Sequence, residues 1–301
     1  MQARTLMRPG LWLALIALLA LGGCAGPAVE ADPPLVVATT TIVGDLTARV
    51  AGEEAVVEVL MPIGADPCDY ELTREQTGRL LEADLIVSSG LGLEEGLAEA
   101  LADAELRGVE VLRLGDALHP RHLGHDEREA FDPYWWMDPL RAAGAVTLIA
   151  DRMLAIDDGG WTTRAVEAER DLCALDVEIR DALWPRRSGP RYLLTDQPGL
   201  GYFAERYDCL VGRPDPVLVE PLGPSSVSAV PSHRDELPGG GVSRMAETEP
   251  TGVGVSRVEA WAPHATINPG TKRVAVFIDS LGEAGSGAET YGDMMLTNAD
   301  R

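Results

Sequence analysis

The sequence has 301 residues, of which 46% are apolar and 24% charged, and its formal net charge is −23 at pH 7. A chain of this length and apolar content can bury a substantial core, which excludes intrinsic disorder as its overall state. The acidic balance repels phosphate backbones, so it excludes nucleic-acid binding.

The chain begins with a segment typical of an export signal. A positively charged start precedes an apolar run over 11–21, which is too short to be a comfortable membrane span. The run ends in the letters LGGC, whose last residue is Cys24, an order typical of bacterial lipoproteins. We therefore expect a signal peptide over 1–23 and a lipid on Cys24 that anchors an extracytoplasmic protein to the bacterial cell membrane. The alternative is an ordinary signal peptide, or a short membrane anchor, with an incidental cysteine.

After a tether over 24–34, strand and helix patterns alternate along the chain. Strands are predicted at 35–39, 56–61, 84–88 and 109–114, and helices at 42–51, 73–83, 93–104 and 139–156. Such alternation with short connections predicts a parallel α/β sheet covered on both faces. We assign an N-terminal α/β lobe to 35–158.

The longest helical pattern spans 161–183, and we predict a linking helix over 159–185. A C-terminal α/β lobe is assigned to 186–301. Its predicted elements are a strand over 192–195, a helix over 200–206, a strand over 273–278 and a helix over 288–295. Residues 212–263 are rich in proline and glycine and show no apolar period, so the second lobe is predicted to be incomplete.

With Cys24 lipidated, three cysteines remain in the exported chain: Cys68, Cys173 and Cys209. An odd number leaves at least one thiol outside any disulfide within the chain. The sequence allows two readings of Cys173 and Cys209, as a disulfide or as two small buried apolar side chains.

Several strings follow one another over 35–210 and 265–298 in a specific order. They are VVATT and IVGDL after Leu35, MPIGADPCDYELT from Met61, ADLIV and GLGLE from Ala83, DPYWWMDP from Asp132, LTDQ and GYFA from Leu194, and DSLG, TY and MM from Asp279. In this order they resemble the zinc/manganese-type metal ABC transporter substrate-binding lipoproteins, the cluster A-I solute-binding proteins. The resemblance implies two α/β lobes of parallel sheet, joined by one long linking helix, with a metal in the cleft between them.

The resemblance also implies a ligand set. At the positions where the family keeps histidines and a carboxylate, this chain has Cys68, Tyr134, Gln197 and Asp279, of which only Asp279 matches. A thiolate is an excellent zinc ligand, but a phenol must lose its proton to bind and an amide oxygen is a weak donor. We therefore expect a site for Zn²⁺ or Mn²⁺ as transported ligand, with impaired binding.

A second group of residues lies in the loop that is often rich in histidine in zinc-type members of the family: His119, His122 and His125. The loop is predicted either to contact a metal weakly and pass it on, or to be a solvated loop with incidental histidines. Trp135 and Trp136 are predicted to pack in the core rather than to form a ligand cage.

The resemblance implies a monomeric solute-binding lipoprotein that captures a divalent cation and delivers it to a metal-ion ABC permease. No nucleophile with a base and no phosphate-binding glycine loop is recognisable, so an enzyme is not predicted and no catalytic cofactor is expected. Two alternatives remain open. One is a non-transport adhesion or interaction lipoprotein that kept the fold but lost the metal, and the other is a degenerate product in which 212–263 is out of frame.

Overall fold

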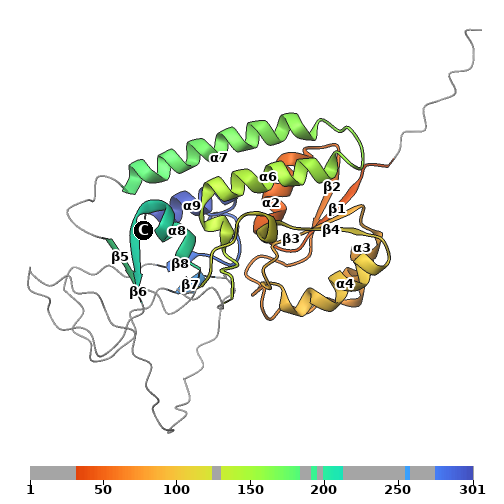
Figure 1. Cartoon of the computed structure of the whole chain (residues 1–301), viewed down its shortest axis with the longest axis horizontal. Helices are drawn as coiled ribbons and strands as arrows, with labels where there is room; N and C mark the ends of the chain where they lie inside the picture. The colour runs from red at the N-terminus through yellow and green to blue at the C-terminus, as the bar shows by residue number, and fades with distance from the viewer. Residues whose placement is uncertain are drawn as a thin grey trace, which may run out of the picture. The chain divides into compact units, whose positions relative to one another are not determined.

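The computed structural model describes residues 32–123, 130–183, 191–194, 199–212, 255–257 and 275–300 (Figure 1). From Pro34 onward the described residues form one compact unit. The predicted signal peptide and Cys24 lie outside the described residues, as do His125, Gln197 and most of the segment 212–263.

The larger sheet has four parallel strands in the order β2-β1-β3-β4. They are β1 (Leu35–Ala38), β2 (Val56–Val59), β3 (Leu85–Ser88) and β4 (Glu110–Arg113). Val36 of the inner strand β1 lies opposite Val57 on one side and Leu85 on the other. The predicted parallel α/β sheet is therefore confirmed.

Both faces of this sheet are covered by helices. Helices α2 (Thr41–Ala51) and α6 (Pro139–Met153) pack on one face, and α3 (Arg74–Glu82) and α4 (Ala98–Leu106) on the other (Figure 1). Side chains of β1 alternate between the two cores, with Val36 and Ala38 in one and Val37 in the other. The continuous apolar run of this strand follows from its burial on both faces.

Polar residues fix where the helices begin. The Thr40 hydroxyl accepts the backbone N–H of Val43 at the start of α2. Thr73 and Gln76 form a reciprocal capping box before α3. The Asp138 carboxylate accepts the N–H of Leu140 at 3.0 Å, and so begins α6.

The long helix α7 (Trp161–Leu183) has the bounds that its apolar spacing predicts. Its buried stripe consists of Trp161, Ala165, Ala168, Leu172, Leu175, Asp176 and Ile179. The helix packs against α2, α6 and α9, and Figure 1 shows it lying alongside α6 and reaching α9. The stripe therefore joins elements from both halves of the sequence.

Within the described residues of the second half of the chain there are two small sheets. Strands β5 (Arg191–Leu194) and β6 (Cys209–Gly212) are parallel and are connected through α8 (Gly201–Tyr207), whereas β7 (Val255–Arg257) and β8 (Ala275–Phe277) are antiparallel. The antiparallel pair departs from the parallel sheet predicted for the second lobe. Three residues between glycines and prolines are too few to show a period, so the sequence did not indicate β7.

Helix α9 (Tyr291–Asp300) replaces the helix predicted over 288–295. It begins later because the Thr290 hydroxyl accepts the N–H of Asp293 at 3.2 Å and so caps the first turn. It runs further because Ala299 is still buried. The remaining short elements are η1 (Glu95–Leu97), α5 (Leu114–Ala117) and η2 (Trp135–Met137).

Candidate metal centre

Three segments that are far apart in the sequence meet beyond the carboxyl ends of the strands. The loop after β2 contacts the segment after β8, since Gly64 donates its N–H to the Ser280 hydroxyl at 3.0 Å. The segment at η2 contacts the same region, since Trp136 Nε1 donates to the Ile278 carbonyl oxygen at 2.9 Å. Open α/β sheets bind ligands at this end of their strands.

Cys68, Tyr134 and Asp279 come together where these segments meet. Burial is the largest cause that raises the pKa of the Cys68 thiol to about 11, and the charges of Asp66 and Asp279 add to it. Burial also raises the pKa of Tyr134, followed by the charge of Asp279, to which the phenol is hydrogen-bonded. The structure thus brings three of the four predicted ligands into one electrostatic cluster, while Gln197 lies outside the described residues.

Cys68 lies in a turn that its neighbour Asp66 caps. The Asp66 Oδ1 atom accepts the N–H of Cys68 at 2.9 Å, so Asp66 has a structural role in this turn. The Cys68 residue is exposed overall, even though burial of its thiol is the largest cause of the raised pKa. Cys68 is therefore only partly withdrawn from solvent.

Tyr134 is 8% exposed. Contacts to its ring and to its backbone N–H both hold it in place. Its ring meets the Trp136 ring edge-on, with 5.4 Å between centroids. Its N–H donates to the Asp132 carboxylate at 3.0 Å. Trp135 and Trp136 are both fully buried, which confirms that they belong to the core.

The donors in this cluster are one thiol, one phenol and one carboxylate. Among the residues that the structure describes, no three histidine, cysteine, aspartate or glutamate side chains are grouped so that they could hold a metal ion. The cluster contains only two side chains of those types, and its third donor is a phenol. An amide oxygen from Gln197 is the further donor that the sequence predicts.

The predicted histidine loop has contacts of its own. His119 has a φ of +50°, and its carbonyl oxygen accepts from Arg141 Nη1 at 2.6 Å. His122 lies against the Phe131 ring, with 4.5 Å between centroids. His125 lies outside the described residues.

Glu94 is a residue whose role the sequence did not reveal. It is 5% exposed, and its carboxylate accepts the Thr39 hydroxyl at 2.6 Å and the N–H groups of Ser89 at 2.6 Å and Gly90 at 3.2 Å. Burial raises its pKa, and these hydrogen bonds oppose the rise. Glu94 ties the end of β1 to the end of β3, next to the segments that form the cluster.

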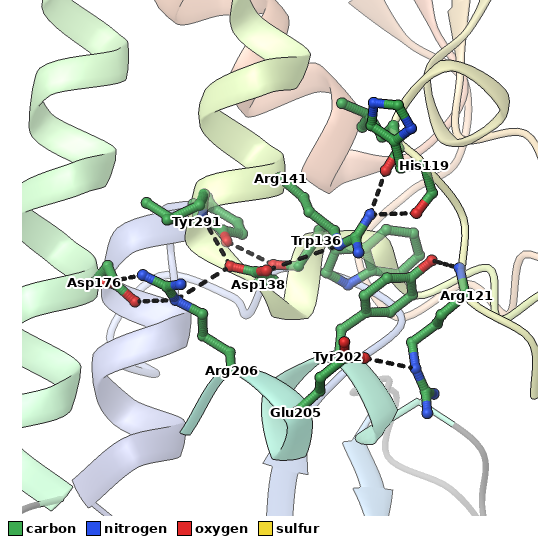
Figure 2. A network of polar contacts seen from close by, with 12 residues as sticks. His119, Arg121, Trp136, Asp138, Arg141, Asp176, Tyr202, Glu205, Arg206 and Tyr291 are labelled. Atoms are coloured by element: carbon green, nitrogen blue, oxygen red, sulfur yellow. Dashed lines mark hydrogen bonds and ion pairs between the residues drawn. The ribbon is translucent and has the colours of Figure 1, made fainter. Parts of the chain in front are cut away.

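A polar network connects the Tyr134 segment to the second half of the chain (Figure 2). Its members include Arg121, Asp132, Asp138, Arg141, Asp176, Tyr202, Glu205, Arg206 and Tyr291. The Tyr291 hydroxyl donates to the Trp136 carbonyl oxygen at 2.5 Å. Burial raises the pKa of Asp176, but hydrogen bonds from Arg206 and Arg180 lower it overall.

Two further observations concern the sequence predictions. Cys173 is exposed on α7, and no disulfide joins it to Cys209, whose thiol lies 3.6 Å from the Tyr207 carbonyl oxygen. The disulfide reading is therefore wrong, and so is the reading of two buried side chains, because Cys173 is exposed and Cys209 is only partly buried. No helix in the described part of the chain combines the length and the apolar character that crossing a membrane requires.

Comparison with known proteins places this architecture among metal-binding receptors. A family model described as zinc-uptake complex component A, periplasmic, matches residues 36–301. The manganese-binding lipoprotein MntA of Halalkalibacterium halodurans is 28% identical over 299 residues, which cover 95% of this chain and 94% of the relative. The high-affinity zinc uptake system protein ZnuA of Paracoccus denitrificans is 28% identical over 263 residues, which cover 74% of this chain and 78% of the relative.

Solved structures share the fold. The periplasmic zinc-binding protein TroA from Treponema pallidum superposes with a TM-score of 0.61 at 22% identity, over 89% of this chain and 97% of that one. The manganese-bound periplasmic metal-binding protein from Candidatus Liberibacter asiaticus gives a TM-score of 0.62 at 18% identity, over 88% of this chain and 97% of that one.

Proposed function

The chain belongs to the family of periplasmic zinc-uptake complex component A proteins, and from this membership we propose that it is the solute-binding component of a metal-ion ABC importer. It captures a divalent cation of the zinc or manganese class outside the membrane and delivers it to a permease. Relatives named for manganese binding and for zinc uptake support both ions as candidates. The family binds a transported solute, so binding rather than catalysis is the activity to be measured.

The proposed cation site consists of Cys68, Tyr134 and Asp279, with Gln197 as the fourth ligand. The proposal rests on the convergence of the first three residues. The charge of Asp279 acts on both Cys68 and Tyr134 and raises the pKa of each. A thiolate, a phenolate and a carboxylate can together hold a divalent ion, although thiol and phenol must first lose their protons. His119, His122 and His125 would form an accessory loop that contacts the ion before it enters.

The anchoring and the domain organisation are part of the same proposal. Cys24 carries the lipid that holds the protein at the outer face of the bacterial cell membrane, and 24–34 is the tether. The lobes are 35–158 and 186–301, and α7 is the stiff connection between them. The protein acts as a monomer toward its permease.

Isothermal titration of the metal-stripped protein with Zn²⁺ and with Mn²⁺ tests the function. We expect saturable binding of one equivalent, which Asp279→Ala weakens. Glu283→Ala is the matched control, because this carboxylate is exposed and lies four residues further along the chain. Absence of saturable binding, or equal loss in both variants, would exclude this cation site and favour an interaction lipoprotein that has lost the metal.

A further inference from the structure

We propose that Asp132, held in place by Arg121, is a positioning residue that fixes Tyr134 in the cation site. The inference rests on the proposed function and deepens it, because it identifies what holds one of the cation's donors. The proposal rests on a buried carboxylate whose two oxygen atoms accept hydrogen bonds from two different partners.

Asp132 is 1% exposed and makes a hydrogen bond from each side of its carboxylate. Oδ1 accepts the N–H of Tyr134 at 3.0 Å, and Oδ2 accepts from Arg121 Nη1 at 2.7 Å. The backbone at Tyr134 therefore cannot shift without breaking a hydrogen bond to a buried charge. A buried carboxylate without a hydrogen-bonding cationic partner would be costly at this depth, so the contact with Arg121 holds Asp132 in place.

Arg121 is in turn fixed by α8. Its backbone N–H donates to the Tyr202 hydroxyl oxygen at 3.0 Å, and its Nε atom donates to Glu205 Oε2 at 3.2 Å. Its guanidinium carbon lies 5.5 Å from the centroid of the Tyr202 ring. Figure 2 shows Tyr202 and Glu205 reaching Arg121 from the same helix. The position of α8 is thereby transmitted through Arg121 and Asp132 to Tyr134.

The first residue of α8 packs directly against the ion pair, in which Asp132 is buried and Arg121 is partly exposed. A Cβ atom at Gly201 would overlap both the Arg121 guanidinium and the Asp132 carboxylate. Only glycine lets the helix approach the pair this closely. The pair is therefore packed between the Tyr134 segment and α8, which is the arrangement expected of a support and not of a solvated surface contact.

Residues that orient a metal ligand typically change metal affinity by about 10-fold to 100-fold when they are replaced. Asp132→Asn keeps the shape but removes the charge that pairs with Arg121, so we expect it to weaken Zn²⁺ binding by about 10-fold or more. Arg121→Met should also weaken Zn²⁺ binding, because it removes the cationic partner of Asp132. Asp103→Asn is the matched control, because Asp103 of α4 pairs with Arg107 where both side chains are well exposed, away from the proposed cation site.

Combining each variant with Tyr134→Phe separates positioning from general destabilisation. If Asp132 acts through the phenol, Asp132→Asn causes no further loss of Zn²⁺ affinity once the phenol is gone. A merely structural role would lower affinity to the same extent in both backgrounds. Thermal melts of the zinc-free proteins verify folding, and Arg121→Met carries the same test if Asp132→Asn does not fold.

The outcomes distinguish this inference from the proposed function. Wild-type protein that fails to bind Zn²⁺ or Mn²⁺ overturns both. Wild-type protein that binds, together with an Asp132→Asn variant of unchanged affinity or with additive losses in the Tyr134→Phe background, overturns the positioning role alone. A Tyr134→Phe variant that binds as tightly as wild type also overturns it.

Discussion

Arg206 of α8 donates two hydrogen bonds to Asp176 of α7, from Nε to Oδ1 at 2.7 Å and from Nη2 to Oδ2 at 2.5 Å. The Asp176 side chain is only 6% exposed, so this two-point pair lies largely out of water. Bidentate arginine–carboxylate pairs of this kind fix geometry as well as adding energy. The pair therefore fastens α8, which also carries the support of Tyr134, to the longest helix of the chain.

Arg206→Met should lower the free energy of unfolding by about 2–3 kcal/mol, because it removes hydrogen bonds to a buried charge. Urea unfolding followed by circular dichroism measures the loss. Arg170→Met is the control on α7, since Arg170 pairs with Asp171 where both side chains are well exposed. We expect the control to change stability by less than about 0.5 kcal/mol. Equal effects of the two variants would contradict a structural role for the Arg206–Asp176 pair.

Two glycines should respond in opposite ways to alanine. Gly201→Ala should destabilise the protein by about 1–3 kcal/mol, because the new methyl group overlaps Arg121 and Asp132. Gly78→Ala should stabilise it by about 0.5–1 kcal/mol, because Gly78 lies inside α3 with nothing within 4 Å of the added carbon. Thermal melts of both variants show whether each raises or lowers the melting temperature. A stabilising Gly201→Ala would contradict the close packing of α8 against the Arg121–Asp132 pair.

Glu94 predicts a dependence of stability on pH. Its pKa is raised in the folded protein by burial, so the folded state binds the Glu94 proton more tightly than the unfolded state does. Its contribution to stability is therefore greatest at low pH and is lost as pH rises from the unfolded pKa to the folded one, by about 1.4 kcal/mol per pH unit. Glu94→Gln cannot ionise and should lack this component. Urea unfolding at about pH 5 and about pH 8 measures the difference between the proteins. We expect the stability of Glu94→Gln relative to wild type to increase from about pH 5 to about pH 8. No such increase would argue against a raised pKa of Glu94.

Cys68 should make the cation site prefer Zn²⁺ to Mn²⁺. Thiolates are soft donors that suit zinc, whereas manganese prefers oxygen and nitrogen ligands. Cys68→Ser should therefore weaken Zn²⁺ binding by at least about tenfold, and Mn²⁺ binding much less. Competition titrations with the two ions measure the ratio, and Cys173→Ser, which alters an exposed thiol on α7, serves as control. An unchanged ratio of the two affinities would remove Cys68 from the site.

The sequence predicted the elements whose patterns are local. The run at β1, the helical pattern at 73–83 and the apolar stripe of α7 all depend on residues that are close together in the chain. These local patterns therefore predicted both the type and the position of the elements. Strand β7 and the start of α9 were not predicted correctly, because one is too short for a period and the other depends on a hydroxyl cap.

The candidate site was predictable only in part. Cys68, Tyr134 and Asp279 were found through ordered strings that resemble a family, not through any spacing that would indicate a metal site. The supporting residues Glu94 and Asp132 were not found, because their partners come from other segments and a buried carboxylate carries no local signature.

Trp136 and Ile278, whose hydrogen bond joins the Tyr134 segment to the Asp279 segment, are separated by 142 positions in the chain. The amino-terminal half of the chain is synthesised first, so its sheet can form before the carboxy-terminal segment exists. The proposed cation site cannot, because its Asp279 donor is synthesised only after the long helix α7. A chain that ends after α7 would consequently lack one of the proposed donors, together with the Ile278 carbonyl that accepts from Trp136.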